Sequence, residues 1–176
     1  MSRLLDVFTG ITRLTLTDAF ILSILFIILT GVCIIDWRTR MIPDTLWIML
    51  TLLGGIRIIC GYVGLLGFLP PVSVTEAAIG CLIVSVPLLL IAMTTGGFGG
   101  GDIKLMGAAG IFLGWQQVVV AFCIGVTVGG LIGAVLLLLR YATRKTMIAF
   151  GPYLALGILI ATLWGVPLMD WYVRVS

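Results

Sequence analysis

Long apolar runs recur along this chain, and short polar segments separate them. The runs are continuously apolar rather than alternating, which is typical of membrane-spanning helices and not of barrel strands. Backbone groups in lipid must bond within their own segment, which also favours helices. The pattern therefore predicts an all-α, polytopic membrane helix bundle of about six transmembrane helices. We expect these helices over residues 19–35, 45–62, 75–93, 102–113, 118–139 and 147–166.

The two ends of the chain are more polar than its middle. Residues 1–18 mix charges with short apolar clusters, which indicates an N-terminal interfacial segment that is retained rather than cleaved. Residues 19–166 are expected to form one transmembrane domain, and residues 167–176 a C-terminal interfacial tail. An even number of spans would leave both termini on the same side of the membrane.

The loop cations suggest an orientation for these helices. One side would carry Arg38, Arg40, Lys104, Arg140, Arg144 and Lys145. The opposite side would carry Arg3, Arg13, Arg57 and Arg174. The positive-inside rule therefore favours, by a small margin, a cytoplasmic location for the first of these sides.

Composition agrees with lipid as the main solvent of the chain. Hydrophobic residues make up 61% of the sequence and charged residues only 10%, whereas a soluble domain carries about 25% charged residues. The net charge of +3 is scattered and forms no basic stripe, so nucleic acid is not an expected partner. The chain has no histidine, and its four cysteines lie apart inside apolar runs, so neither a metal site nor a cofactor is expected.

One predicted helix, over residues 118–139, carries glycines at every fourth position: Gly125, Gly129 and Gly133. This spacing places them on one face, where another helix backbone can approach closely. The partner is either another helix of the same chain or a second copy, and the second case would give a homo-oligomer.

Two acidic residues stand out as candidates for chemistry. Asp36 ends an apolar run, and an ionisable group at the edge of hydrocarbon is a functional candidate, although it can also be an interfacial carboxylate paired with Arg38 or Arg40. Asp102 follows three glycines and opens a helix, where it can act as a helix N-cap. Glycine at membrane depth also allows the backbone to bend and leaves room for an extended substrate.

The other acids have simpler interpretations. Asp44 follows Pro43 at the predicted start of a helix, which predicts an N-cap. The remaining acids are expected to be solvated or capping charges: Asp6, Asp18, Glu76 and Asp170.

Asp36 and Asp102 together suggest a specific chemistry. Two carboxylates that meet at one membrane face cannot easily both ionise, so they would share a proton and titrate as a pair. The ionised member can take a proton from water, while the protonated member polarises a scissile carbonyl. Aspartic peptidases use this arrangement, which needs neither histidine nor metal.

Three sequence blocks resemble those of the type IV prepilin (leader) peptidase family. Residues 36–44, DWRTRMIPD, are similar to its Asp-x-x-x-x-x-Ile/Leu-Pro-Asn/Asp block. Residues 99–105, GGGDIKL, fit its Gly-x-Gly-Asp-x-Lys-Leu block, and residues 150–157, FGPYLALG, are similar to its Phe-Gly-Pro-Phe-Leu-Ala block. The blocks occur in family order, and the resemblance covers about residues 19–166.

The resemblance implies an aspartic endopeptidase of the inner membrane. It would remove the leader from prepilins or pseudopilins at the cytoplasmic face, with Asp36 and Asp102 as the catalytic pair. The residues expected to support the substrate or the loop are Gly99, Gly101, Lys104, Arg38 and Arg40. Long family members add a cytoplasmic domain with Cys-x-x-Cys motifs and also methylate the new N-terminus. This sequence shows neither, so it resembles the short class, and methyltransferase activity is not expected.

A non-enzymatic alternative remains open at this point. A small ion- or proton-coupled transporter or channel subunit could use the same two carboxylates. Transporters usually place such a site near the bilayer midplane, whereas Asp36 and Asp102 are both predicted at helix ends on one face. The location of the two acids therefore discriminates between the two hypotheses.

Overall fold

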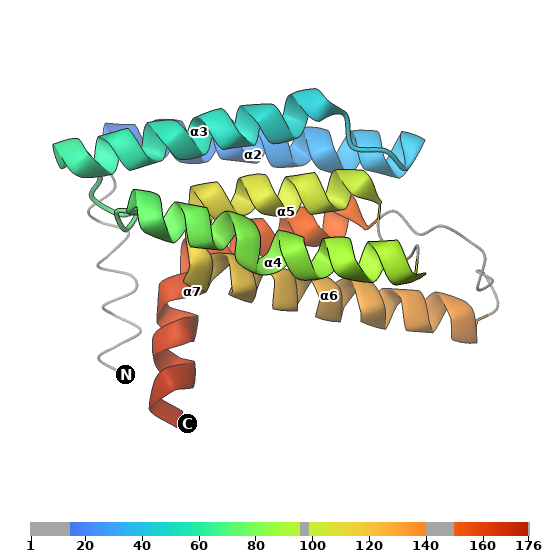
Figure 1. Cartoon of the computed structure of the whole chain (residues 1–176). Coiled ribbons are helices and arrows are strands. Elements are labelled where there is room, and N and C mark those ends of the chain that lie inside the picture. Colours follow the sequence, from blue (N-terminus) through green and yellow to red (C-terminus); the bar gives the residue numbers. More distant parts are fainter. Residues whose placement is uncertain (1–14, 96–98, 140–149, 176) are drawn as a thin grey trace.

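The computed structural model describes residues 15–95, 99–139 and 150–175, and all regular structure in these residues is helical. The helices are α2 (Leu16–Thr39), α3 (Asp44–Val63), α4 (Val74–Thr95), α5 (Gly100–Leu113), α6 (Trp115–Leu138) and α7 (Gly151–Val175). Successive helices run in opposite directions along the bundle (Figure 1). The predicted all-α helix bundle is therefore confirmed.

Several helix boundaries differ from the predicted ones. Helix α2 begins at Leu16, because Thr15 and Asp18 form a reciprocal capping box at its N-terminus. It continues to Thr39, so Asp36 lies inside the last turn rather than after the helix. The backbone of α7 is helical to Val175, through most of the predicted C-terminal tail. Most of the predicted N-terminal segment, residues 1–14, lies outside the described residues.

Four of the described helical segments are long and apolar enough to cross a membrane: Leu16–Thr39, Asp44–Val63, Val74–Thr94 and Trp115–Val135. The segment Gly151–Gly165 is apolar but shorter. Large apolar side chains such as Phe20, Leu52 and Leu131 are exposed on the outside of the bundle, where lipid can cover them. The chain is therefore a multi-pass membrane protein.

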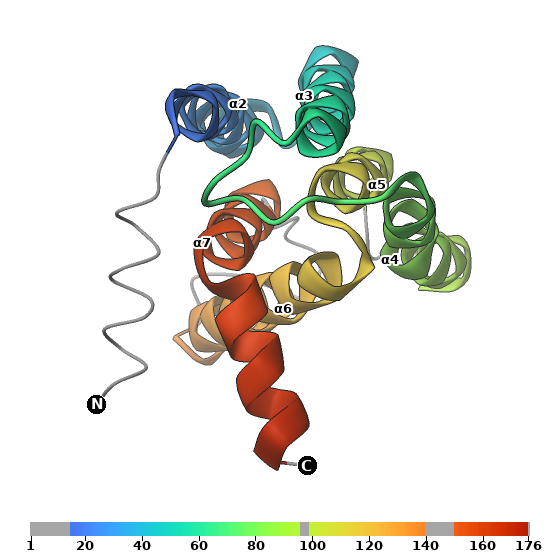
Figure 2. The ribbon, with the colours of Figure 1, turned by 90° about the vertical axis from the view of Figure 1, so that its left-hand side faces the viewer.

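Helix α5 occupies the centre of the bundle. It contacts α3, α4, α6 and α7, and with α7 it lies between the pair α2–α3 and the pair α4–α6 (Figure 2). All residues from Leu105 to Gly110 are buried, which requires neighbours on every side of the helix. With 14 residues, α5 is about 21 Å long, shorter than the hydrocarbon core of a bilayer at about 30 Å.

Glycine permits two of the closest helix contacts. Gly80 of α4 and Gly110 of α5 face each other so closely that a Cβ atom on either would collide with the backbone of the other helix. On α6, a Cβ atom at Gly125 would contact Leu154, and one at Gly129 would contact Phe150 and Tyr153. The predicted glycine face thus packs against the segment that forms α7 of the same chain, and its third member, Gly133, is also buried. The structure therefore gives no support for a homo-oligomer through Gly125, Gly129 and Gly133.

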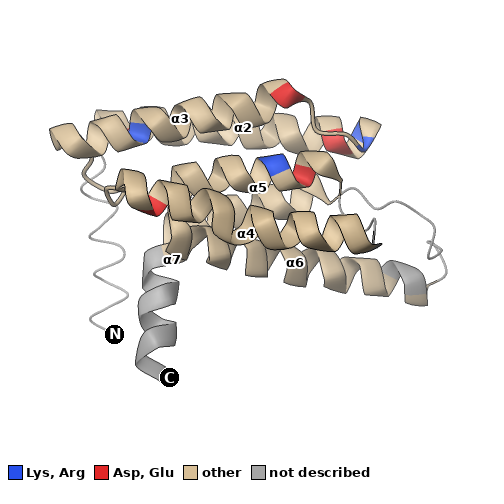
Figure 3. Cartoon of the chain, in the orientation of Figure 1, with Lys and Arg blue, Asp and Glu red and all other residues tan. Residues whose placement is uncertain are grey.

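The charged positions of the described residues fall into two groups along the bundle, with an uncharged stretch between them (Figure 3). One group includes Arg57, which the sequence assigned to an outside segment but which is fully buried. Its guanidinium donates to the carbonyl oxygens of Phe112 at 2.6 Å and Pro70 at 3.0 Å. It also lies 4.8 Å from the centre of the Phe112 ring. Arg57 thus ties α3 to the end of α5 and to the loop before α4.

Asp18 belongs to the same end of the molecule and is buried rather than solvated. Besides its capping role, its carboxylate accepts hydrogen bonds from the backbone N–H groups of Gly67, Phe68 and Leu69. These bonds hold the loop between α3 and α4 against the start of α2. The pattern alone could not reveal this, because the partners lie about fifty residues away in the sequence.

Candidate active site

Asp36 is held by the first residue of another helix. Its side chain is only 4% exposed, and Oδ2 accepts a hydrogen bond of 2.8 Å from the backbone N–H of Gly151. Gly151 begins α7, and the positive end of a helix dipole favours a carboxylate at this point. A Cβ atom at Gly151 would lie 2.7 Å from Asp36 Oδ2, so only glycine leaves room for the carboxylate.

Asp102 lies in the first turn of α5 and is half-buried. The N-cap of this helix is Gly99, so Asp102 does not occupy the N-cap position. Its backbone N–H donates to the carbonyl oxygen of Gly99 at 3.1 Å. This local bond places Asp102 at the start of the helix.

The fold brings these two acids to the same end of the bundle. Because the helices alternate in direction, the end of α2 lies beside the starts of α3, α5 and α7 (Figure 1). Asp36 is near enough to Asp102 for its negative charge to act on the second carboxyl group. Like charges at this range disfavour simultaneous ionisation. Ionisation of one carboxyl group therefore favours the neutral form of the other.

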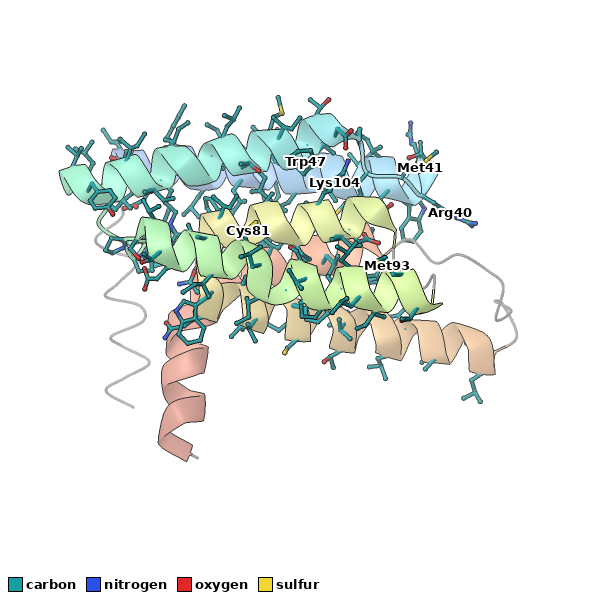
Figure 4. The ribbon with its side chains drawn as sticks, in the orientation of Figure 1. Arg40, Met41, Trp47, Cys81, Met93 and Lys104 are labelled. Atoms are coloured by element: carbon teal, nitrogen blue, oxygen red, sulfur yellow. The ribbon has the colours of Figure 1, made fainter. Side chains whose placement is uncertain are left out.

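Asp44 does not cap its helix as predicted. The extended residue Pro43 occupies the N-cap position, which makes Asp44 the first residue of α3. Asp44 Oδ1 accepts from Lys104 Nζ at 2.8 Å and from Trp47 Nε1 at 2.7 Å. Lys104 Nζ also lies 5.5 Å from the centre of the Trp47 ring, and the two side chains lie side by side between α3 and α5 (Figure 4).

The remaining candidate residues surround the same end of the bundle. Arg38 and Arg40 are exposed, and within the described residues neither forms an ion pair with Asp36. Arg40 ends α2 in the left-handed backbone region, with φ 54°, and its side chain points away from the helices (Figure 4). Gly99 is exposed, whereas a Cβ atom on Gly101 would lie 3.0 Å from Ile42 Cβ.

The described residues bring together no group of three or more His, Cys, Asp or Glu side chains that could hold a metal ion. What they offer is a pair of carboxylates on different helices, with glycine backbone beside them. Sequence reasoning identified both carboxylates but missed the role of Gly151 as a donor to Asp36. The Phe-Gly-Pro block carried the signal, although nothing in the block names its partner.

Comparison with known proteins found a matching family and several similar relatives. A profile described as the Type IV leader peptidase family matches residues 23–166. The chain is 36% identical over 149 residues to a prepilin leader peptidase/N-methyltransferase of Aeromonas salmonicida, covering 82% of this chain and 49% of the relative. It is 33% identical over 160 residues to a protein of the same name from Bacillus subtilis, covering 88% of this chain and 60% of the relative. No solved structure matches the chain.

A further relative, from Pseudomonas aeruginosa, has the same printed name. It is 35% identical over 139 residues, which cover 78% of this chain and 47% of the relative. The chain thus spans about half the length of the curated relatives that it matches.

Proposed function

This chain belongs to the type IV leader peptidase family, and from this premise we propose that it is an aspartic endopeptidase that removes the leader from prepilins or pseudopilins. Cleavage would occur at the cytoplasmic face of the inner membrane. One observation carries the proposal. Asp36 is hydrogen-bonded to the first residue of α7, and it lies at the same end of the bundle as Asp102 in the first turn of α5, near enough for the two charges to interact. Two carboxylates from separate helices at one bundle end are what an aspartic mechanism needs.

In this mechanism the pair, rather than either residue, holds the proton. The ionised carboxylate takes a proton from a water molecule as it attacks the scissile carbonyl. The neutral carboxyl group donates a hydrogen bond to the carbonyl oxygen and stabilises the charge that develops there. The proton then passes to the leaving amine, and the pair returns to its shared state. We assign Asp36 and Asp102 to these two roles as a unit.

The glycines before Asp102 leave space for a substrate chain. Gly99 and Gly100 are exposed, and a Cβ atom on Gly100 would meet no other atom within 4 Å. An extended peptide can therefore lie against this backbone, beside the Asp102 carboxyl group. Arg38 and Arg40 extend from the same end of the bundle, where they can contact lipid headgroups or the polar part of a substrate.

The alternative function, an ion- or proton-coupled transporter or channel subunit, has less support. Such proteins usually bind their ion near the bilayer midplane, between broken helices. Here both carboxylates lie in end turns, Asp36 in the last turn of α2 and Asp102 in the first turn of α5. The N-methyltransferase activity in the relatives' names is not assigned, because the chain spans about half of their length.

The test is to incubate a candidate prepilin with the purified protein in detergent and to measure the mass of the cleavage product by mass spectrometry. Asp36→Asn and Asp102→Asn should each lower the rate by roughly 10³-fold or more, since general acid–base catalysis contributes up to about 10⁴-fold. Each variant should still insert into the membrane and elute as folded protein. Near-normal cleavage by either variant would remove that residue from the catalytic pair.

A further inference from the structure

Lys104 lies at an unexpected place in its helix. It is the fifth residue of α5, near the N-terminus, where the helix dipole disfavours a positive charge. The reason for its position must therefore lie outside α5. The described structure gives it one ion-pair partner, Asp44, which begins α3.

Asp44, Trp47 and Lys104 form a three-part contact between the first turns of two helices. A single oxygen atom, Asp44 Oδ1, accepts from both Lys104 Nζ and Trp47 Nε1. The ammonium group also lies over the face of the indole ring, which adds a cation–π attraction. Together these bonds fix the direction in which the Lys104 side chain leaves α5.

This direction is coupled to that of Asp102. Residues two apart on an α-helix point about 200° apart around its axis. The ion pair holds Lys104 towards α3, and Asp102 leaves the same turn of α5 in a different direction, at the end of the bundle that it shares with Asp36 and the start of α7. The close contact between Gly101 and Ile42 keeps the same turn against the segment that joins α2 to α3.

We propose that Asp44 is a positioning residue for the reaction. Through Lys104 and Trp47 its carboxylate sets the rotation of the first turn of α5, and so the placement of Asp102 opposite Asp36. The inference rests on the proposed peptidase function, and it assigns to Asp44 a role other than helix capping.

We expect the Asp44–Lys104 ion pair to affect the position of Asp102 more than the stability of the folded protein. The side chains of Lys104 and Asp44 are 50% and 65% exposed, and exposed ion pairs contribute little to folding. Catalysis is more sensitive, because a misplacement of about 1 Å can lower a rate by roughly 100-fold. We therefore expect that loss of the pair lowers kcat by roughly ten-fold and leaves KM and the unfolding midpoint unchanged.

The experiment uses the purified full chain in detergent and a prepilin peptide with a fluorescent reporter. Asp44→Asn keeps an acceptor for Trp47 Nε1 but removes the ion pair, and Lys104→Met removes the charge at similar length. Lys104→Arg keeps the charge and should retain near wild-type kcat. Glu76→Gln is the matched control, because it makes the same carboxylate-to-amide change in the first turn of α4, at the other end of the bundle.

The double variant Asp44→Asn/Lys104→Met makes the test independent of any single substitution. If the two residues act as one contact, its kcat should be no lower than that of either single variant. Multiplied losses in the double variant would overturn the inference. So would wild-type kcat in both single variants, or a loss that appears only in KM, which would indicate a direct contact with substrate.

The outcome also separates this inference from the proposed function. If the wild type cleaved the prepilin and Asp36→Asn or Asp102→Asn cleaved it equally well, the catalytic pair would be refuted. The same holds if the wild type did not cleave at all. In either case Asp44 would have no role in placing Asp102. Cleavage that depends on both acids but not on Asp44 or Lys104 would leave the peptidase standing and overturn the positioning role alone.

Discussion

The close contact between the Asp36 carboxylate and Gly151, the first residue of α7, leads to a specific prediction for Gly151→Ala. The added methyl group would lie 2.7 Å from Asp36 Oδ2 and 2.9 Å from its Cγ, whereas ordinary contact begins at 3.4 Å. The carboxyl group would therefore have to retreat by about 0.7 Å, the difference between 2.7 and 3.4 Å. The backbone N–H of residue 151 remains, so the change alters the position of Asp36 rather than its charge.

This displacement should affect the rate far more than the fold. A shift approaching 1 Å at a reacting group can lower a rate by roughly 100-fold, so we expect kcat to fall by roughly 30- to 100-fold. That loss corresponds to about 2 to 3 kcal/mol in the activation barrier. Overpacking of this kind lowers stability by about 1–3 kcal/mol, which a folded membrane bundle can tolerate.

The assay is steady-state cleavage of a prepilin peptide in detergent, with the thermal unfolding midpoint measured on the same preparation. Gly130→Ala is the matched control, because a Cβ atom there meets nothing within 4 Å. It should keep wild-type kcat. If Gly151→Ala also kept wild-type kcat while remaining folded, the position of the Asp36 carboxylate would not matter for cleavage, and its catalytic role would be refuted.

Three further predictions concern other parts of the chain. Gly101→Val should lower kcat by at least roughly ten-fold without loss of membrane insertion, because its side chain would push the first turn of α5 away from Ile42; normal activity would show that this contact is dispensable. Arg57→Met should lower the free energy of unfolding by about 3 kcal/mol, since it leaves the carbonyl groups of Phe112 and Pro70 without their donor. Thermal melting in detergent measures this loss, and an unchanged midpoint would contradict it. Chelators should leave cleavage intact, because the proposed reaction uses carboxylates alone; inhibition by a chelator that added zinc reverses would point to a metal enzyme.

The helices could be predicted from the sequence because their signal is local. Continuous apolar runs and short polar breaks mark each helix within its own residues. The boundaries were less predictable, since they depend on single capping contacts. Helix α2 begins three residues earlier than expected through the capping box of Thr15 and Asp18, and α3 begins with Asp44 because Pro43 takes the N-cap position.

The candidate site could be predicted only in part. The motifs around Asp36 and Asp102 identified two carboxylates, and the predicted helix order placed them on one face. The pattern could not show what holds them, because the partners are distant in sequence: Gly151 donates to Asp36 across 115 positions, and Lys104 reaches Asp44 across 60. These contacts exist only when helices pack against each other.

The buried charged residues also show what the sequence can predict and what depends on the tertiary structure. Composition alone determined that lipid is the main solvent of this chain, because 10% charged residues cannot cover a soluble surface. It could not determine which charges are buried, since this depends on whether another segment supplies hydrogen-bond partners. Arg57 and Asp18 lie inside the protein because the carbonyl and N–H groups of the loop before α4 meet them there. Only the tertiary structure decides this, since it alone brings those partners together.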